Sequence, residues 1–408
     1  MKKRVFTHLS WRVVLFALLF LFSLYSTYVY LFISQKGYDN TMVLLAIQFL
    51  SGHTALSIYG LPMNDVAAYY NNYYVYFGPL GAFLLMPIVF FFKYSTPQVL
   101  LGVGSLIVSF ITVFFIGKEF KFTPIDRLWL ALFFVFSTVL FASGVINITA
   151  YQVEALSVPF VLLSLLMYLQ KRNPLLIGLL LGLAVMTRFT LVLAIVFFFL
   201  EFVQKRLTLR QFVMICIPVA IVLGILGLYN NRRFHSFLET GYNYSVTKDA
   251  IPISWNLKYG DFSITHVPAN LYSFLIMSPT ALEMKDNGGF VLRFPYMKID
   301  PWGLAIWFSS PLFLLLIARF KKGVFSLSAG ITALVLSLPV FLWYSIGYAQ
   351  SGYRYTLDFL PFLFLLLLPC LSPKLSKTAI ILITLGVLFN CIYIESIWEI
   401  YPVLGILR

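Results

Sequence analysis

The sequence predicts an all-α polytopic membrane protein with about eleven transmembrane helices and one re-entrant or juxtamembrane element. Of its 408 residues, 61% are hydrophobic and 11% are charged, and the mean hydropathy is +0.90. A soluble domain carries about 25% charged residues. A soluble fold of this length cannot hide so much apolar surface from water, which excludes soluble enzymes, disordered proteins and coiled coils.

The charge distribution supports the same class. The chain carries 29 Lys and Arg against 15 Asp and Glu, a formal net charge of +14. In a soluble protein such an excess would indicate nucleic acid, but here the basic residues form short clusters between apolar runs, as cytoplasmic loops do. We therefore expect no nucleic-acid partner. The clusters are Lys2-Lys3-Arg4, Lys171-Arg172, Lys205-Arg206 with Arg210, Arg319 to Lys322, and Lys374 with Lys377.

Apolar runs of about 20 residues, the length that crosses a bilayer core as a helix, recur along the chain. The runs that reach or approach this length are 12–33, 98–117, 127–146, 155–170, 211–228, 302–318, 325–343, 357–371 and 378–394. The first follows a basic N-terminus but is too long for a cleaved signal peptide, and no small-residue cleavage site follows it. It is expected to be an uncleaved first helix.

The stretch 174–203 is predominantly apolar and is interrupted near its middle by Thr187-Arg188. As one helix it would place Lys171-Arg172 and Lys205-Arg206 on opposite sides of the membrane. As a hairpin of two short helices it keeps both basic pairs on the cytoplasmic side, which the positive-inside rule favours. The sequence therefore predicts a hairpin with Arg188 at its tip.

The run 78–92 is short and contains Gly78-Pro79 and Pro87. Loop 118–127 is basic and loop 147–154 has no Lys or Arg, so these loops are expected on the cytoplasmic and external sides. With the N-terminus on the cytoplasmic side, these loop positions are possible only if the segment 78–92 does not cross the membrane. The N-terminus is then inside and the C-terminus outside.

Two polar segments are expected on the external side of a single transmembrane domain covering 1–408. Segment 35–77 has helical apolar spacing over 43–50, typical of a helix on the membrane surface. It ends in an aromatic run, 69–77, that indicates either an interfacial belt or carbohydrate stacking. Segment 229–300 is expected to cap the membrane body.

Several polar residues are not explained as cytoplasmic anchors, and the predicted topology places all of them on one side. Charged groups at membrane depth are costly and usually face a functional cavity, so one outward-facing polar site is expected. These residues are Asp39, Asp65, Glu154, Arg188, Arg232, Arg233, Glu239, Arg354 and Asp358.

Arg188 is the most informative of these residues. Each arm of the hairpin is about 20 Å long, shorter than the hydrocarbon core, so its tip lies below the outer membrane surface. A guanidinium at that depth needs a partner, either a lipid phosphate or a structural carboxylate.

Three other residues keep structural alternatives. Arg354 and Asp358 have i, i+4 spacing and can pair with each other on one helix. For Asp39 the alternative to a catalytic role is a purely structural one, as the N-cap of the helix that follows it.

Metal and nucleotide chemistry receive no support from the motifs. The four histidines lack metal-ligand spacing, the three cysteines are scattered through apolar runs, and there is no Gly-rich nucleotide loop or nucleophile motif. We therefore expect no metal site and no required cofactor, although a dependence on divalent metal is left undecided.

The order of several segments resembles the GT-C superfamily of polyprenyl-phosphate-sugar-dependent glycosyltransferases, particularly bacterial relatives of the dolichyl-phosphate-mannose–protein mannosyltransferases. The resemblance covers nearly the whole chain and rests on order and placement, since no single segment is specific. The segments are the first helix with Asp39 after it, Tyr74 to Pro79 leading to Pro87, Gly178 to Arg188, Tyr229 to Phe234, Leu238 to Tyr242, and Gly352 to Pro361.

The resemblance implies an inverting transfer from a polyprenyl-phosphate sugar to an acceptor hydroxyl on a protein, glycolipid or polymer. The acceptor needs a base and the departing lipid phosphate needs a cation. Asp39 matches the essential acidic residue of the superfamily's first external loop, and Arg188 fits the phosphate clamp. Asp39 is therefore the preferred base, but the superfamily's Asp-X-Asp or Glu-X-Asp form is absent, so Asp65 is kept as the alternative. The other candidates for substrate binding are Glu154, Arg233, Glu239, Tyr242, Arg354, Tyr355 and Asp358.

The expected enzyme is a multi-pass hexosyltransferase of the plasma membrane that acts in the cell envelope, with its site facing the external side. Two other classes are weighed against it, a transporter or lipid flippase and a catalytically inactive assembly subunit. Transporters often show matching broken helices in two halves. Only one such hairpin is recognised here, in 174–203.

Overall fold

The computed structural model describes residues 10–34, 39–57, 65–248, 253–286, 289–348, 350–371 and 373–393, and this part of the chain is mostly helical. Five of its helices are long and apolar enough to cross a membrane, so the chain is a membrane protein. These are α1 (Trp11–Ser34), α4 (Leu100–Glu119), α7 (Thr149–Leu169), α10 (Leu209–Phe234) and α15 (Val324–Leu342).

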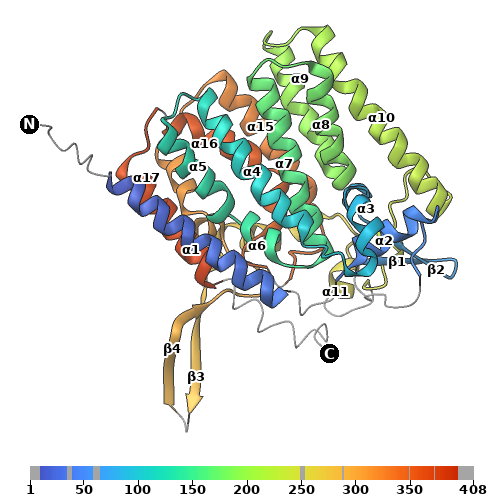
Figure 1. The fold of residues 1–408 in the computed structure, drawn as a ribbon, viewed down its shortest axis with the longest axis horizontal. Coiled ribbons are helices and arrows are strands. Elements are labelled where there is room, and N and C mark those ends of the chain that lie inside the picture. The colour runs from blue at the N-terminus through green and yellow to red at the C-terminus, as the bar shows by residue number, and fades with distance from the viewer. Residues whose placement is uncertain are drawn as a thin grey trace, which may run out of the picture.

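Shorter helices complete the bundle, in which α1, α5, α4, α7, α8 and α10 lie roughly alongside one another (Figure 1). The shorter helices of ten or more residues are α2 (Thr41–Leu50), α3 (Leu80–Phe92), α5 (Pro124–Phe136), α8 (Pro174–Thr187), α16 (Leu360–Leu371) and α17 (Lys377–Tyr393). The remaining ones are α6 (Leu140–Val145), α9 (Ile195–Val203), α11 (Ile253–Leu257), α12 (Val267–Leu275), α13 (Ile306–Ser309) and α14 (Leu314–Ala318).

The predicted count of about eleven spans is not confirmed, since two predicted helices are interrupted. In 127–146 the helix stops at Ser137 and restarts as α6. In 302–318 the chain breaks at Ser310 before Pro311, which lacks the N–H group that a continuous helix needs, so α13 and α14 are separate.

The basic loops gather at one end of the bundle, which we call the basic end. The side chain of Gln170, after α7, donates to Glu119 of α4, and Arg319 approaches Ser376 before α17. The Arg206 guanidinium lies 6.0 Å from the centroid of the Phe325 ring. The predicted cytoplasmic loops therefore share one end, and we call the other end the site end.

The stretch 174–203 has the geometry of the predicted hairpin. Helix α8 ends at Thr187, Arg188 is extended, and a 3-10 turn over Phe189–Ala194 leads into α9. The chain thus reverses at Arg188 and returns to the basic end.

Two glycines bring α8 close to α10. A Cβ atom on Gly178 would lie 2.1 Å from the carbonyl oxygen of Ile215, and one on Gly182 would lie 3.0 Å from the Val222 side chain. Helices in membranes pack closely where small residues recur at this four-residue spacing. The contact holds the first half and middle of α8 against α10, and α8 ends at the residue before Arg188.

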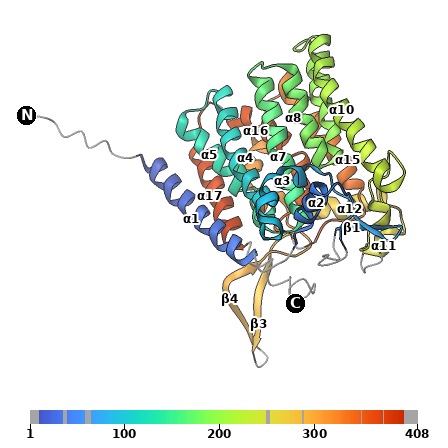
Figure 2. The same ribbon diagram turned by 45° about the vertical axis from the view of Figure 1, so that its right-hand side comes forward.

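Two antiparallel hairpins depart from the predicted all-α fold. Strands β1 (Val66–Tyr69) and β2 (Asn72–Val75) pair at the site end, where the aromatic run begins. Strands β3 (Thr280–Asp286) and β4 (Gly289–Lys298) project from the bundle (Figures 1 and 2). Period-two pairing over so few residues is weak against the strong helical pattern of the chain.

The segment predicted not to cross the membrane is the 13-residue helix α3, which is not among the five long helices. It packs beside α2, with the rings of Phe49 and Phe83 stacked at 4.9 Å. Five of the ten α2 residues are buried, so one face of this predicted surface helix packs against the protein body.

Candidate functional site

Four charged residues form a buried network at the site end. Arg188 Nη1 lies 3.0 Å from Glu154 Oε1, and Arg354 Nη1 lies 2.6 Å from the same oxygen. Arg188 also pairs with Asp358, through Nε to Oδ1 at 2.6 Å and Nη2 to Oδ2 at 3.0 Å. The two carboxylates are almost fully buried and each guanidinium is about one-eighth exposed. All four residues were candidates from the sequence, and the network balances two positive charges against two negative ones.

The structural alternative in which Arg354 pairs with Asp358 is not the arrangement found. These residues lie on a 3-10 turn, Arg354–Asp358, instead of an α-helix. With three residues per turn, positions i and i+4 point about 120° apart, so the two side chains do not meet. Arg354 therefore turns to Glu154 on α7, and Asp358 turns to Arg188.

Polar and aromatic side chains complete the network. The Thr190 hydroxyl donates to Asp358 at 2.8 Å. The Arg354 guanidinium carbon lies 4.8 Å from the centroid of Tyr151 and 4.7 Å from that of Tyr355. Sequence reasoning missed Thr190 and Tyr151. Tyr151 precedes Glu154 by three residues, and that spacing places both on one helix face.

Asp39 and Asp65 meet the first turn of α7. Asp39 accepts from the Thr149 N–H at 2.6 Å and the Thr149 hydroxyl at 2.7 Å, and from the Thr41 hydroxyl at 2.8 Å. Asp65 accepts from the Tyr76 hydroxyl at 2.8 Å and from the N–H of Ala150. A helix N-terminus favours negative charge and presents free N–H groups, so it suits two carboxylates.

Asp39 is not a simple N-cap in the structure. The N-cap residue of α2 is Asn40, and its side chain makes no capping bond. Asp39 binds the first residue of α2, Thr41, through its N–H at 3.2 Å and also ties α2 to α7. It is therefore a buried link between two helices.

The Asp65 carboxyl has an unusual proton affinity. Removal from water and the neighbouring negative charge of Asp39 raise its pKa to about 6, against the opposing effects of Tyr76, Arg354 and the Ala150 N–H. A carboxyl with this pKa exchanges its proton close to neutral pH, as a general acid or base must.

A cavity of about 760 Å³ adjoins the network. It lies between the site ends of α8 and α10 and the segment 76–79. Its polar lining includes Arg188, Arg233, Thr190 and Tyr242, and its apolar lining includes Val185, Leu223, Leu226, Leu228, Phe237 and Leu238. The outer face of α10 beside it is an exposed apolar stripe, Ile217, Ile221, Ile225 and Leu228, as expected of a helix surface in contact with lipid.

Arg233 is a charged residue of this cavity that has no carboxylate partner among the described residues. Its guanidinium donates to Asn230 Oδ1 at 2.7 Å and to the carbonyl oxygen of Val75, and it lies 3.9 Å from the Tyr229 ring centroid. Within the described ranges, no Asp or Glu lies within ion-pair distance of it. Arg233 is 3% exposed, so its charge is almost removed from water.

Two further predicted residues have different positions. Tyr242 lines the cavity and its ring lies 4.5 Å from that of Tyr76. Glu239 is not part of the network, because its carboxylate accepts from the Gly241 N–H at 2.7 Å and from Asn243 Nδ2 at 2.6 Å within its own loop.

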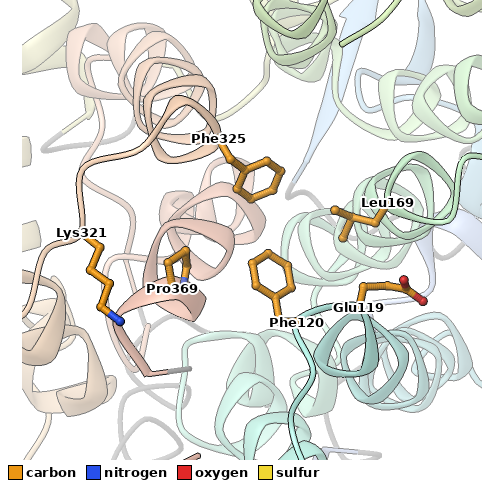
Figure 3. Close-up of a pocket in the computed structure, with 6 residues that line it drawn as sticks. All are labelled: Glu119, Phe120, Leu169, Lys321, Phe325 and Pro369. Atoms are coloured by element: carbon orange, nitrogen blue, oxygen red, sulfur yellow. The ribbon is translucent and has the colours of Figure 1, made fainter. Parts of the chain in front are cut away.

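Over the part of the chain that the structure describes, no group of three or more His, Cys, Asp or Glu side chains could hold a metal ion. A separate cavity of about 520 Å³ lies at the basic end, lined by Phe120, Leu169, Phe325 and Pro369 with Glu119 and Lys321 (Figure 3).

No protein-family model and no curated protein sequence matches this chain. Two solved structures of an oligosaccharyltransferase from Archaeoglobus fulgidus are similar to it at 12% identity, the apo form with a TM-score of 0.40 and a complex with an inhibitory peptide and a dolichol-phosphate with 0.41. The matches cover 95% and 96% of this chain and 56% of those chains, so this chain spans about half their length. Similarity at this level carries no argument about activity, and the GT-C resemblance stays a prediction.

Proposed function

We propose that this chain is a membrane-embedded glycosyltransferase that moves a sugar from a polyprenyl-phosphate donor to an acceptor hydroxyl, with inversion. The observation that carries the proposal is the cavity at the site end. It joins an apolar wall beside the lipid-facing stripe of α10 to Arg233, and it touches Tyr76, which binds Asp65. A lipid tail, a phosphate and a reacting hydroxyl each have a matching surface there.

We assign binding of the donor phosphate to Arg233 in preference to Arg188. Arg188 is already neutralised by Glu154 and Asp358, whereas Arg233 has no carboxylate partner in the described chain. A desolvated guanidinium binds phosphate through charge-assisted hydrogen bonds. Arg188 then orients the phosphate from the other side of the cavity as part of the network.

The base is assigned to Asp65 in preference to Asp39. Neither carboxylate is in the cavity lining, but Asp39 is occupied by four hydrogen bonds from Thr41 and Thr149. Asp65 has a pKa near 6 and is bound to Tyr76, which lines the cavity. A general base works best when its pKa lies near the operating pH.

The proposed transfer step requires no cofactor. The oxygen of the acceptor hydroxyl attacks the anomeric carbon from the face opposite the phosphate, and its proton passes to Asp65. The bond between the anomeric carbon and the phosphate oxygen breaks, and polyprenyl phosphate leaves with the electron pair. Arg233 stabilises the charge that develops on the leaving group.

Because the site lies opposite the basic loops, we propose that it faces the outer side of the plasma membrane. The test is to incubate purified protein with radiolabelled polyprenyl-phosphate sugars and an envelope extract, and in parallel to reconstitute it in liposomes with the same lipids. Transfer of label to the extract supports the proposal. Transbilayer movement of intact donor would identify a flippase, and neither activity with any donor would indicate an assembly subunit.

A further inference from the structure

A small cavity lies on the loops at the site end, outside the network and the larger cavity. Its volume is about 160 Å³, comparable with that of one hexose ring. The segment carrying α11 and α12 forms one wall, and residues 344–346 form the other. Asn256 Nδ2 donates to the Tyr344 carbonyl oxygen at 3.1 Å, and the Tyr344 N–H donates to the backbone carbonyl oxygen of Asp261 at 3.0 Å. These two hydrogen bonds hold the walls together.

The lining has the chemistry of a neutral, hydroxylated ligand. Three aromatic rings, those of Tyr259, Trp302 and Tyr344, stand beside neutral hydrogen-bonding groups such as Asn256 and Thr265. The lining contains no Lys, Arg, Asp or Glu among the described residues, and Nε2 of its one histidine, His266, lies 3.0 Å from the carbonyl oxygen of Gly260. A sugar ring has C–H faces that pack on aromatic rings and hydroxyl edges that hydrogen-bond to amides and hydroxyls, whereas a phosphate would need a fixed cation and a lipid tail an apolar wall.

This cavity is connected to the network by two routes. Burial raises the pKa of the Tyr344 phenol, and the nearby Tyr355, Tyr242, Asp261 and Asp65 raise it further, so this phenol lies within electrostatic range of the proposed base. The Trp302 ring lies 4.5 Å from that of Tyr348, and the Tyr348 carbonyl accepts from the Tyr151 hydroxyl at 2.6 Å. A molecule in the small cavity would therefore contact Trp302 and Tyr344, and Trp302 is connected through Tyr348 to Tyr151 beside the network.

We propose that the acceptor is a carbohydrate, and that this cavity binds one of its sugar units through Trp302 and Tyr344. This inference rests on the proposed function. The bound unit holds the acceptor chain so that a hydroxyl of a neighbouring unit reaches Asp65 and becomes the new glycosidic oxygen, with the proton and leaving group distributed as above.

Two variants alter the cavity by opposite means. Trp302→Ala removes the largest ring, and Trp302→Phe restores an aromatic face. Ala269→Trp fills the cavity from an exposed position on α12, so it leaves no void in the protein. The control is Trp255→Ala, because Trp255 is 64% exposed on α11 and does not line the cavity.

The experiment uses the full chain in lipid bilayers, saturating donor, and two acceptor panels, methyl glycosides with short oligosaccharides and Ser/Thr peptides. We expect transfer to saccharides, and an increase of about tenfold in acceptor KM for Trp302→Ala and Ala269→Trp. The kcat, the donor KM and the thermal stability of Ala269→Trp should stay near those of the wild type, as should every constant of Trp255→Ala.

Transfer to peptides alone would overturn the carbohydrate inference and leave the proposed function intact. An unchanged acceptor KM in both folded variants would also overturn it. Absence of donor cleavage with every acceptor would overturn the proposed function itself, and this result is distinct because cleavage is measured separately.

Discussion

The Oε1 atom of Glu154 lies 2.6 Å from Nη1 of Arg354, which is 200 residues further along the chain. The same oxygen lies 3.0 Å from Arg188 Nη1, so one carboxylate holds two guanidinium groups. Through this atom α7, the tip of the α8–α9 hairpin and the Arg354–Asp358 turn are fixed to one another. Glu154 is therefore the centre of the site's rigid frame.

Glu154→Gln should destabilise the protein strongly. The amide removes the negative charge that both arginines share, and breaking a buried ion pair by removing one partner costs about 3–5 kcal/mol. The measurement is the free energy of unfolding in mixed micelles. The matched control is Glu119→Gln at the basic end, where the side chain is exposed and bonds only to Gln170 in the described chain. The control should change stability by less than about 0.5 kcal/mol, and equal losses in both variants would contradict the network's role.

Arg233→Gln should weaken donor binding. The loss of a charge-assisted contact to phosphate is worth about 1.5–3 kcal/mol, or about 10- to 150-fold in Kd. Binding of a polyprenyl phosphate is measured by titration of the purified protein. The neighbouring Arg232 is exposed, so Arg232→Gln serves as the control and should bind normally. If the two variants bind equally well, Arg233 is only a structural residue of α10.

The sequence was sufficient to predict the class of protein, the common end of the basic loops and the reversal of the chain at Arg188. These features follow from hydropathy and charge spacing, which act locally. It was also sufficient to list the four network residues, because a charge inside an apolar run stands out. The partners within the network could not be predicted, since a pair separated by 200 residues leaves no local pattern.

Other features of the site could not be predicted for particular reasons. The i, i+4 pairing of Arg354 with Asp358 assumed α-helical geometry, and the structure has a 3-10 turn there. The binding of Asp39 and Asp65 to the first turn of α7 depends on how two distant segments pack. Glu239 was grouped with the site by its position in the chain, and among the described residues its carboxylate accepts hydrogen bonds from Gly241 and Asn243 of its own loop.

Gly178→Ala should loosen the contact between α8 and α10. Its new methyl group would meet the Ile215 carbonyl at 2.1 Å, so the helices must separate, at a cost of about 1–3 kcal/mol. Gly104→Ala in α4 has open space around the new methyl group, and it should be neutral or stabilising by up to about 1 kcal/mol. Thermal unfolding of both variants is the measurement, and a neutral Gly178→Ala would refute the close packing.

The pH dependence of turnover should report Asp65. Its pKa is raised to about 6, so the carboxyl is protonated and inactive as a base below that pH and ionised above it. We expect kcat/KM for the acceptor to rise with pH and to level off above about pH 7. Folding stability should have the opposite slope, falling between about pH 4 and 6 because the folded state holds this proton more tightly than the unfolded chain. A rate that is flat from pH 5 to 8 would contradict the assignment.

The most direct test of the account is single-turnover cleavage of the donor's sugar–phosphate bond by wild type and Asp65→Asn, with donor binding measured on the same samples. The amide cannot accept a proton at neutral pH, and general bases contribute about 10²- to 10⁴-fold. The account predicts a loss of that size in cleavage with donor affinity nearly unchanged. Cleavage at the wild-type rate by Asp65→Asn, or donor bound but never cleaved by the wild type, would contradict it.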